Sequence, residues 1–469
     1  MFYIVESEKS LQHLESLGKS GCFLEIVQAN DNFHPKLSKL VAVYIRPLEG
    51  DPVVNVNSGE ISGSVEKGYI IPICHDEGLN VSFDRVKLVL KHFSKIYVRN
   101  KKQVLYYFNV GPECIDLNLK QVMLHYSTMN IVVREKTCDW FYNRYGGSEN
   151  LNQIIPLPKL YERCEDIFGQ VQKYLTEEPE PEGFNFYNEI ATKAFFLVEQ
   201  NGIRVDKHNF IERFKPLNAD FSIEGETVYT SYNLYNITSR PTNSFNSVNF
   251  LAIPKGVEFR RCFKPQNSKF YEFDYDGFHC RIVSELINYP LSVNIKAHKQ
   301  LASLRTGKVA SEITGEEYVA AKSANFKMIY GTPSESDRKL EFSQKIQEYV
   351  EKLWKQYKKE GKVSNLESGK VFSKELSDMY NSKLFNYMIQ SLETSKNIVS
   401  LYEVLRYLNK RGARSKIVLV TYDAFLLDYA ESDGPEIIQG IKGIMEKRNH
   451  EGNTVFPVEI KESLDLNFD

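Results

Sequence analysis

The sequence has no long hydrophobic run and no pattern of paired cysteines. None of its apolar runs approaches the ~18 residues that a membrane-spanning helix needs. Its 7 cysteines are odd in number and include no C-x-x-C pair, which argues against a zinc ribbon or a secreted disulfide framework and favours a reducing compartment. Glu6, Glu8 and Lys9 would interrupt the apolar region of a signal peptide. We therefore expect a soluble intracellular protein with no membrane association.

An excess of charge of either sign is also missing. The 469 residues include 59 Lys and Arg and 61 Asp and Glu, a net charge of −2, which argues against a protein that coats nucleic acid through bulk charge. The composition is 42% hydrophobic and 26% charged, which is typical of globular proteins and excludes collagen, coiled-coil and fully disordered chains. Charge is unevenly spread, however, because residues 287–311 contain four cations and no acid. Any nucleic-acid binding should therefore be groove-like and salt-sensitive.

A linker is predicted at residues 177–183, which contain two prolines, four acids and no apolar residue. Such a segment cannot pack against a core, so it marks a domain boundary. Before it, apolar runs at 21–27 and 39–45 predict strands, and helical spacing occurs within 86–93 and 151–175. This alternation is typical of an α/β layer fold.

Two aspartates are predicted to lie on rigid strands of the second part. A strand is predicted over 269–273 and runs into Asp274. Two more strands, at 416–421 and 425–429, are expected to form a hairpin with Asp423 at its tip. Two such carboxylates can bridge a pair of divalent metals ~4 Å apart that activate an attacking oxygen and stabilise a leaving one in phosphoryl transfer. The alternative interpretation is a pair of ordinary turn aspartates.

A helix with one unusual face is predicted after Thr314, which forms a capping-box pattern with Glu317. Lys322, Phe326 and Tyr330 follow one another at intervals of four and share a face of this helix. A cation, a flat apolar ring and a ring with a polar tip are what a phosphate and a stacked base require. The alternative is a core stripe with a snorkelling lysine.

Taken together and in this order, these segments resemble the family A DNA polymerases, the group of bacterial polymerase I and many phage replicases. The first motif of the family, a strand followed by Asp-Tyr and a helix, corresponds to residues 273–281. The second, Lys-x3-Phe-x3-Tyr-Gly, is kept with every spacing from Lys322 to Gly331, and the third corresponds to residues 422–424. Lesser elements line up at 238–241 with 249–254, at 386–390, and at His298, 24 residues before Lys322. The resemblance covers about residue 184 to the C-terminus.

The resemblance implies an α/β and α+β multidomain fold, in which an RNase H-like exonuclease-type domain precedes a palm and fingers polymerase core. The implied divisions are 1–176 for the exonuclease-like domain, 177–183 for the linker, and 184–469 for the polymerase domain, with a reduced thumb segment at 184–239, palm at 240–290 and 384–469, and fingers at 291–383.

The resemblance also implies a DNA-directed DNA polymerase that uses two Mg²⁺ ions, replaceable by Mn²⁺. The implied metal ligands are Asp274, Asp423 and the carbonyl of Tyr275, and the implied catalytic residues are Asp274, Asp423 and Lys322. The implied nucleotide-binding residues are His298, Lys322, Phe326, Tyr330, His279 and Tyr275. The implied primer–template contacts are Arg240, Arg281, Gln390, Asn386 and Tyr422. The implied partners are primer–template DNA, dNTPs and a processivity or replication protein.

Four positions depart from the family pattern. His279 takes the place of the glutamate that blocks the ribose 2′-hydroxyl in the family, which leaves sugar selection open. Tyr318 replaces an arginine that contacts the triphosphate. Ala424 replaces the carboxylate after Asp423, and Tyr422 replaces a histidine near the primer terminus. Each change should weaken catalysis, but none removes the two aspartates.

The thumb of the family is also reduced. Only 33 residues separate Asp206 from Arg240, where the family places long helices. A missing thumb loses grip on the duplex, so we expect low processivity or a partner that supplies the grip.

The first part matches the exonuclease-type domain only loosely. Its expected first motif has Glu25 followed by Val27 in place of Asp-x-Glu, and Val104 stands where the second motif needs an acid. An apolar residue cannot ligate a metal. Glu165 or Asp166 could survive from the last motif. We therefore predict an inactive exonuclease-like scaffold.

Three hypotheses follow. The first is a compact, phage-type DNA polymerase without proofreading, working in a bacterial or phage-infected cell. The second is a ribonucleotide-tolerant polymerase or primase-like enzyme, motivated by His279. The third is a catalytically silent polymerase-like subunit that binds nucleic acid, motivated by Ala424, Tyr318 and the short thumb.

Overall fold

A computed structural model defines the fold. The structure describes residues 4–17, 21–48, 68–131, 139–145, 148, 150–175, 180–214, 223–243, 248–254, 256–447 and 455–468. The chain divides into two compact units. The first unit comprises Met1–Phe196, Phe214–Ser231 and Ser244–Val248, and the second comprises Leu197–Arg213, Tyr232–Asn243 and Asn249–Asp469. Residues 177–179 of the predicted linker lie outside the described part of the chain.

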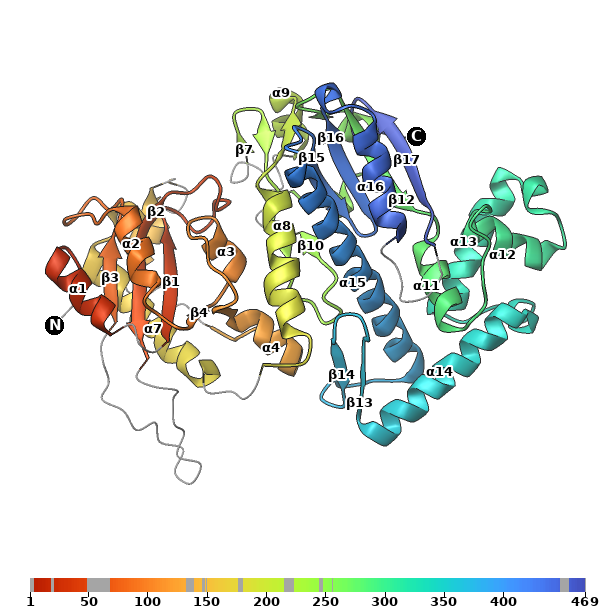
Figure 1. Ribbon diagram of the computed structural model, residues 1–469, viewed down its shortest axis with the longest axis horizontal. Coiled ribbons are helices and arrows are strands. Elements are labelled where there is room, and N and C mark those ends of the chain that lie inside the picture. Colours follow the sequence, from red (N-terminus) through yellow and green to blue (C-terminus); the bar gives the residue numbers. More distant parts are fainter. Residues whose placement is uncertain are drawn as a thin grey trace. The chain divides into compact units, whose positions relative to one another are not determined.

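The first unit is built on a five-stranded sheet of order β3-β2-β1-β4-β5 (Figure 1). The strands are β1 (Cys22–Gln28), β2 (Leu40–Pro47), β3 (Tyr69–Pro72), β4 (Ile96–Val98) and β5 (Cys114–Asp116). Strand β1 pairs antiparallel with β2 and parallel with β4. All seven residues of β1 are buried, because helices cover both faces of the sheet. The strands predicted at 21–27 and 39–45 are therefore confirmed as β1 and β2.

Alternate side chains of β1 enter two different cores. Leu24 and Ile26 pack with helices α1 (Glu8–Ser16) and α2 (Phe83–Leu90) on one face. Phe23 and Val27 pack with α7 (Leu157–Leu175) on the other. This two-sided burial explains why β1 reads as a continuous apolar run in the sequence. The other helices of this unit are α3 (Lys101–Leu105), α4 (Leu117–His125), α5 (Asp139–Tyr145), α6 (Leu151–Ile154), the π-helix η2 (Phe186–Ala191) and α8 (Thr192–Glu199), the last of which runs on into the second unit.

The second unit contains a four-stranded antiparallel sheet of order β15-β16-β12-β17. Its strands are β12 (Lys269–Tyr275), β15 (Lys416–Thr421), β16 (Ala424–Tyr429) and β17 (Val458–Ser463). Figure 1 shows helices α15 (Asn381–Lys410) and α16 (Glu436–Lys447) beside this sheet. The hydroxyl of Tyr275 ties β12 to both helices, because it lies 3.0 Å from the Ser400 hydroxyl and donates to the Met445 carbonyl at 3.1 Å.

Helices α11 (Phe278–Leu286), α12 (Ala297–Thr306), α13 (Gly315–Tyr330) and α14 (Glu341–Glu360) follow β12, with a hairpin of β13 (Lys362–Ser364) and β14 (Val371–Ser373) before α15. The predicted capping box opens α13. The Thr314 hydroxyl accepts from the Glu317 amide at 3.2 Å, and the Glu317 carboxylate accepts from the Thr314 amide at 2.9 Å. The helix ends at Tyr330, as the following glycine predicts.

The segment between Asp206 and Arg240 is short and irregular in its described part. It contains the eight-residue helix α9 (Lys207–Phe214) and two-residue strands. The remaining short elements of the chain are β6 (Ile203–Val205), β7 (Ile223–Glu224), β8 (Thr227–Val228), β9 (Tyr232–Asn233), β10 (Thr242–Asn243), α10 (Val257–Arg260) and β11 (Phe263–Lys264). None of the helices in the described ranges is both long enough and apolar enough to cross a bilayer.

Candidate active site

A cavity of about 420 Å³ lies in the second unit, beside the ends of β12 and the β15–β16 hairpin. Helices α11, α12, α13 and α15 supply much of the rest of its lining, together with Arg240, Asp276, Gly277 and Glu459. Most of the residues singled out from the sequence line it together, although they come from segments up to 183 residues apart. These residues are Arg240, Asp274, Tyr275, His279, His298, Lys322, Phe326, Tyr330, Gln390, Tyr422 and Asp423.

The sheet register brings the two aspartates into this cavity. Asp274 pairs directly with Ala424, the residue after Asp423, across β12 and β16. Asp423 lies in a two-residue turn in which Tyr422 has a left-handed φ of 55°. Tyr422 lacks the freedom of glycine there, so the turn is held from outside, in part because the Asn397 amide donates to the Tyr422 carbonyl.

The two carboxylates repel each other in a poorly solvated place. Burial, and then the charges of Asp423 and Glu459, raise the pKa of Asp274 to about 7. Burial, and then the charge of Glu393, raise the pKa of Asp423 to about 7. Within the described residues, no three His, Cys, Asp or Glu side chains form a complete metal site. Two carboxylates in one cavity nevertheless fit Mg²⁺, which is held by one or two carboxylates together with substrate phosphates.

We predict that Asp423→Asn stabilises the metal-free protein at pH 8. Both aspartates have a pKa near 7 when folded and about 3.8 ordinarily, so the folded state holds more protons between these values. Their contribution to stability is present at low pH and is lost as the pH rises through 7. The variant should gain about 1–3 kcal/mol at pH 8 and less at pH 5. Thermal melts in EDTA measure this, and a lower melting temperature of the variant at pH 8 would contradict it.

A cation and a neutral imidazole lie at one end of the cavity. Lys322 is exposed on α13, and His298, from α12, is 4% exposed. Burial, and then the charge of Lys322, lower the pKa of His298 to about 4, so the ring is neutral at pH 7. The amide nitrogen of Asn325 donates to Nδ1 of His298 at 2.8 Å, which leaves the ring proton on Nε2. A lysine and an N–H donor together can hold a phosphate group.

Two stacked rings follow along α13. The ring of Phe326 is 39% exposed and lies parallel to that of Tyr330, with 6.1 Å between centroids and 16° between planes. An exposed flat ring of this kind offers a stacking surface to a base. The alternative of a core stripe is therefore wrong for Lys322 and Phe326, which are both exposed.

A chain of polar contacts crosses the cavity lining. The Tyr330 hydroxyl lies 2.5 Å from Nδ1 of His279, and Nε2 of His279 lies 2.9 Å from the Glu393 carboxylate. The same carboxylate accepts from Arg240 at 3.0 Å, and the Arg240 guanidinium lies 3.9 Å from the ring centre of Tyr422. Glu393 was missed in the sequence. Its signal was its place on α15 three residues after Gln390, which puts both on one face of the helix.

Two predicted site residues are not part of the cavity lining. Arg281 is 2% exposed, and its guanidinium donates to the side chain and carbonyl of Asp276 and to the carbonyls of Ser292 and Ile295. These bonds connect α11 to the loop before α12. Arg281 therefore has a structural role here, in place of the predicted primer contact. The amide of Asn386 donates at 3.5 Å to the carbonyl of Tyr330.

Buried polar atoms without a hydrogen bond gather around the cavity. Twelve such side-chain atoms occur in the described residues, and eight belong to lining residues, to residues bonded to them or to their neighbours in the chain. These eight belong to Ser239, Arg240, His279, Asn325, Asn386, Glu393, Thr394 and Asn397. Buried polar groups are nearly always satisfied in folded proteins. Their concentration here indicates a place where a polar ligand or water completes the structure.

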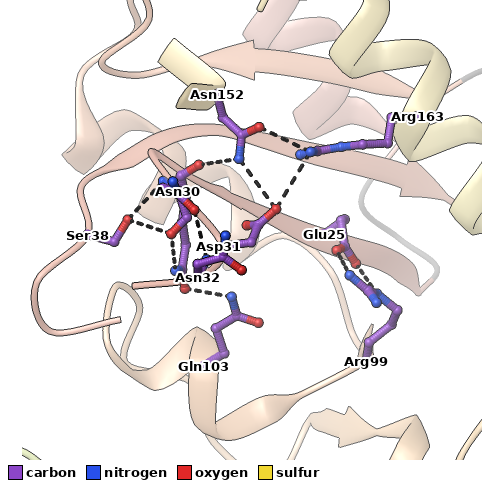
Figure 2. A network of polar contacts seen from close by, with 10 residues as sticks. Glu25, Asn30, Asp31, Asn32, Ser38, Arg99, Gln103, Asn152 and Arg163 are labelled. Atoms are coloured by element: carbon purple, nitrogen blue, oxygen red, sulfur yellow. Dashed lines mark hydrogen bonds and ion pairs between the residues drawn. The ribbon is translucent and has the colours of Figure 1, made fainter. Parts of the chain in front are cut away.

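The first unit holds the acids of the predicted exonuclease-type motifs in a different way. Figure 2 shows Glu25 of β1 clasped by Arg99, whose Nε donates at 2.8 Å. In the same view Arg163 donates to Asn152 at 3.1 Å and lies 3.6 Å from Asp31. An arginine thus occupies the space beside each of these two carboxylates where a metal ion would have to bind.

Of the two acids expected in the last motif, Asp166 has a buried carboxylate oxygen without a hydrogen-bond partner, whereas Glu165 is engaged. Glu165 accepts from Arg46 at 3.0 Å and from the Tyr44 hydroxyl at 2.7 Å. Asp116 caps α4, because its carboxylate accepts from the amides of Lys101 at 2.9 Å and Leu119 at 3.0 Å. Guanidinium and amide donors therefore replace metal ions as the partners of these carboxylates.

The chain is similar to known DNA polymerases, although no protein-family model matches it. It is 22% identical over 268 residues to a DNA polymerase of Bacillus phage SP01, and this match covers 47% of this chain and 29% of the relative. It is 25% identical over 239 residues to DNA polymerase I of Aquifex aeolicus (strain VF5), and this match covers 44% of this chain and 40% of the relative. The chain thus spans less than half the length of the curated relatives that it matches.

The fold is also found among solved structures. The POL domain of Pol1 from M. smegmatis, solved in complex with DNA primer-template and dNTP, matches 99% of this chain and 99% of its own with a TM-score of 0.68 and 13% identity. The comparisons support the resemblance derived from the sequence motifs: the chain is similar in sequence to proteins named DNA polymerase and DNA polymerase I, and it shares its fold with a polymerase POL domain.

Proposed function

We propose that the chain is a template-directed DNA polymerase that adds deoxynucleotides to a primer 3′ end. The observation that carries this proposal is the meeting of Asp274, Asp423 and Lys322 in one cavity. Two carboxylates that repel each other across a cavity supply the charge that paired divalent cations neutralise, and the lysine supplies the charge that a triphosphate needs.

The proposed roles follow the geometry of the cavity. Asp274, Asp423 and the Tyr275 carbonyl would hold two Mg²⁺ ions, which when bound stabilise charge on the attacking and leaving oxygens. His298 and Lys322 hold the triphosphate, and Phe326 and Tyr330 stack on the incoming base. Gln390, Arg240 and Tyr422 line the cavity from other segments and would face the primer–template.

We assign the parts of the chain accordingly. Residues 240–290 and 384–469 form the proposed palm, 291–383 the fingers, and 184–239 a reduced thumb segment. Between Asp206 and Arg240, the described part of that segment offers one eight-residue helix. Grip on the duplex would therefore come mainly from charge, so synthesis should be distributive and salt-sensitive unless a partner protein holds the DNA.

Primer extension tests the proposal. A labelled primer on a DNA template is incubated with the full chain, Mg²⁺ or Mn²⁺ and dNTPs, either singly or all together. We expect each single dNTP to be added only opposite its complementary base, and all four to give full extension. No extension by the wild type under any of these conditions would overturn the proposal in favour of a catalytically silent subunit.

We predict that the chain does not shorten DNA from the 3′ end. The arginine partners of Glu25 and Glu165 offset the charges of these carboxylates and compete with metal ions for them. A labelled primer with a mismatched 3′ terminus should stay intact with Mg²⁺ and no dNTPs for as long as a matched primer needs for full extension with dNTPs. Shortening that persists in Asp423→Asn and disappears in Glu25→Gln would contradict this and locate a nuclease in the first unit.

A further inference from the structure

The cavity presents its groups in the order of the parts of a nucleotide. Lys322, Phe326 and Tyr330 follow one another at successive turns of α13, which spans about 12 Å over these eight residues. The first turn of α11 runs beside them. Its Cys280 lies 3.8 Å from His298 at the phosphate end, and its His279 contacts Tyr330 at the ring end. A nucleotide with its phosphates at Lys322 and its base on the rings would bring its sugar toward the α11 side of the cavity, where His279 is part of the lining.

His279 cannot reorient freely, because each ring nitrogen has a polar group close to it. Nδ1 faces the Tyr330 hydroxyl and Nε2 faces the Glu393 carboxylate. Its ring meets that of Tyr330 edge-on at 5.4 Å and 78°. The side chain of Glu393 is 2% exposed and also contacts Arg240. Burial opposes its ionisation, but the contacts with His279 and Arg240 hold the pKa of Glu393 below its ordinary value, so the anchor is charged.

Resting on the proposed polymerase function, we propose that Glu393 is a positioning residue that fixes His279 against Tyr330 and thereby excludes ribonucleotides. A ribose adds a 2′-hydroxyl where the imidazole stands, and the imidazole is held in that place between Tyr330 and Glu393. Rejection thus comes from occupied space. A pocket that rejects an added hydroxyl by contact reaches about 10²-fold discrimination.

The test compares kcat/KM for dATP and for ATP opposite a template dT. Glu393→Ala releases both His279 and Arg240, and we expect the dATP-to-ATP ratio to fall at least tenfold. Glu393→Gln keeps the shape and one acceptor oxygen, so its ratio should lie between those of the wild type and the alanine variant. A merely structural defect lowers both kcat/KM values equally and leaves their ratio unchanged.

Lys396→Met is the matched control. Lys396 is also a buried charge on α15, one turn beyond Glu393, and pairs with Glu367 and Glu285. Its loss should lower stability without changing the ratio. A second variant tests the route of the effect. If Glu393 acts through His279, then His279→Ala and the double variant with Glu393→Ala should have the same ratio.

The outcomes separate this inference from the proposed function. Absence of extension by the wild type overturns the function itself. Three other results would overturn the role of Glu393 while leaving the polymerase function intact. They are a wild-type dATP-to-ATP ratio near one, an unchanged ratio in Glu393→Ala, and a double variant whose ratio falls by the product of the two single effects.

Discussion

Primer extension by the Asp423→Asn variant is expected to be at least about 10³-fold slower than by the wild type, which corresponds to about 4 kcal/mol or more. Asparagine keeps the shape of the side chain but removes its negative charge. Paired divalent cations would then keep Asp274 but lose the carboxylate of the hairpin turn, and a neutral amide balances their charge poorly. The rate of a single dNTP addition in Mg²⁺ measures the effect.

Asp428→Asn is the matched control for this prediction. Asp428 lies five residues on, in strand β16, and its carboxylate accepts from the amides of Gln266 at 2.8 Å and Asn267 at 3.0 Å, away from the cavity. Its replacement should lower stability but leave extension within a few-fold of the wild type. A melting temperature that Mg²⁺ raises at pH 8 in the wild type and not in Asp423→Asn would show that the loss lies in metal binding. Full activity of Asp423→Asn would contradict the proposed mechanism.

The replacement Arg281→Met is expected to destabilise the second unit by about 3–5 kcal/mol. Arg281 is buried with Asp276, and methionine offers no donor in place of the guanidinium. Asp276 would keep only the amide of Ala297, which donates to it at 2.9 Å, as a partner for a buried charge. Thermal melts and hydrogen exchange over α11 and the start of α12 measure the loss. A primer contact, as the resemblance implied, would predict lost activity with unchanged stability.

A double variant isolates the cause of this loss. Asp276→Asn together with Arg281→Met removes both charges, so it should be more stable than Arg281→Met alone. Arg406→Met is the control, because Arg406 is 65% exposed in a surface pair with Glu403 and should change stability by only a few tenths of a kcal/mol. Equal stability of the double variant and Arg281→Met would show that the buried charge is not the source of the loss.

Local patterns determined a large share of this site. The capping box at Thr314 set the start of α13, and the intervals of four residues put Lys322, Phe326 and Tyr330 on one face, because both depend only on helix geometry. The hairpin around Asp423 was likewise predicted from two apolar strands, at 416–421 and 425–429, and the structure only starts the second strand one residue earlier, at Ala424. Helix and hairpin signals lie within a few residues of each other, so a single sequence is enough to show them.

Other features were decided only by the tertiary structure. Glu393 lies 114 residues from His279 and 153 from Arg240, and no pattern near Glu393 in the sequence predicts either partner. The sequence could show that Glu25 departs from the motif and that Glu165 could survive, but not that Arg99, just after β4, and Arg46, in β2, pair with them. Arg281 matches a family motif, yet its burial turns it into a structural residue.

The physical reason for this division is the range of the forces involved. Backbone hydrogen bonds and side-chain periodicity act between near neighbours. They are therefore enough to predict the strands, the helix α13 and the place of Asp274, Asp423 and Lys322 within these elements. The state of a buried charge depends on whichever groups the packed core brings within about 3 Å of it, because water is excluded there. Only the folded chain therefore decides which carboxylates are paired with arginines and which can bind metal ions.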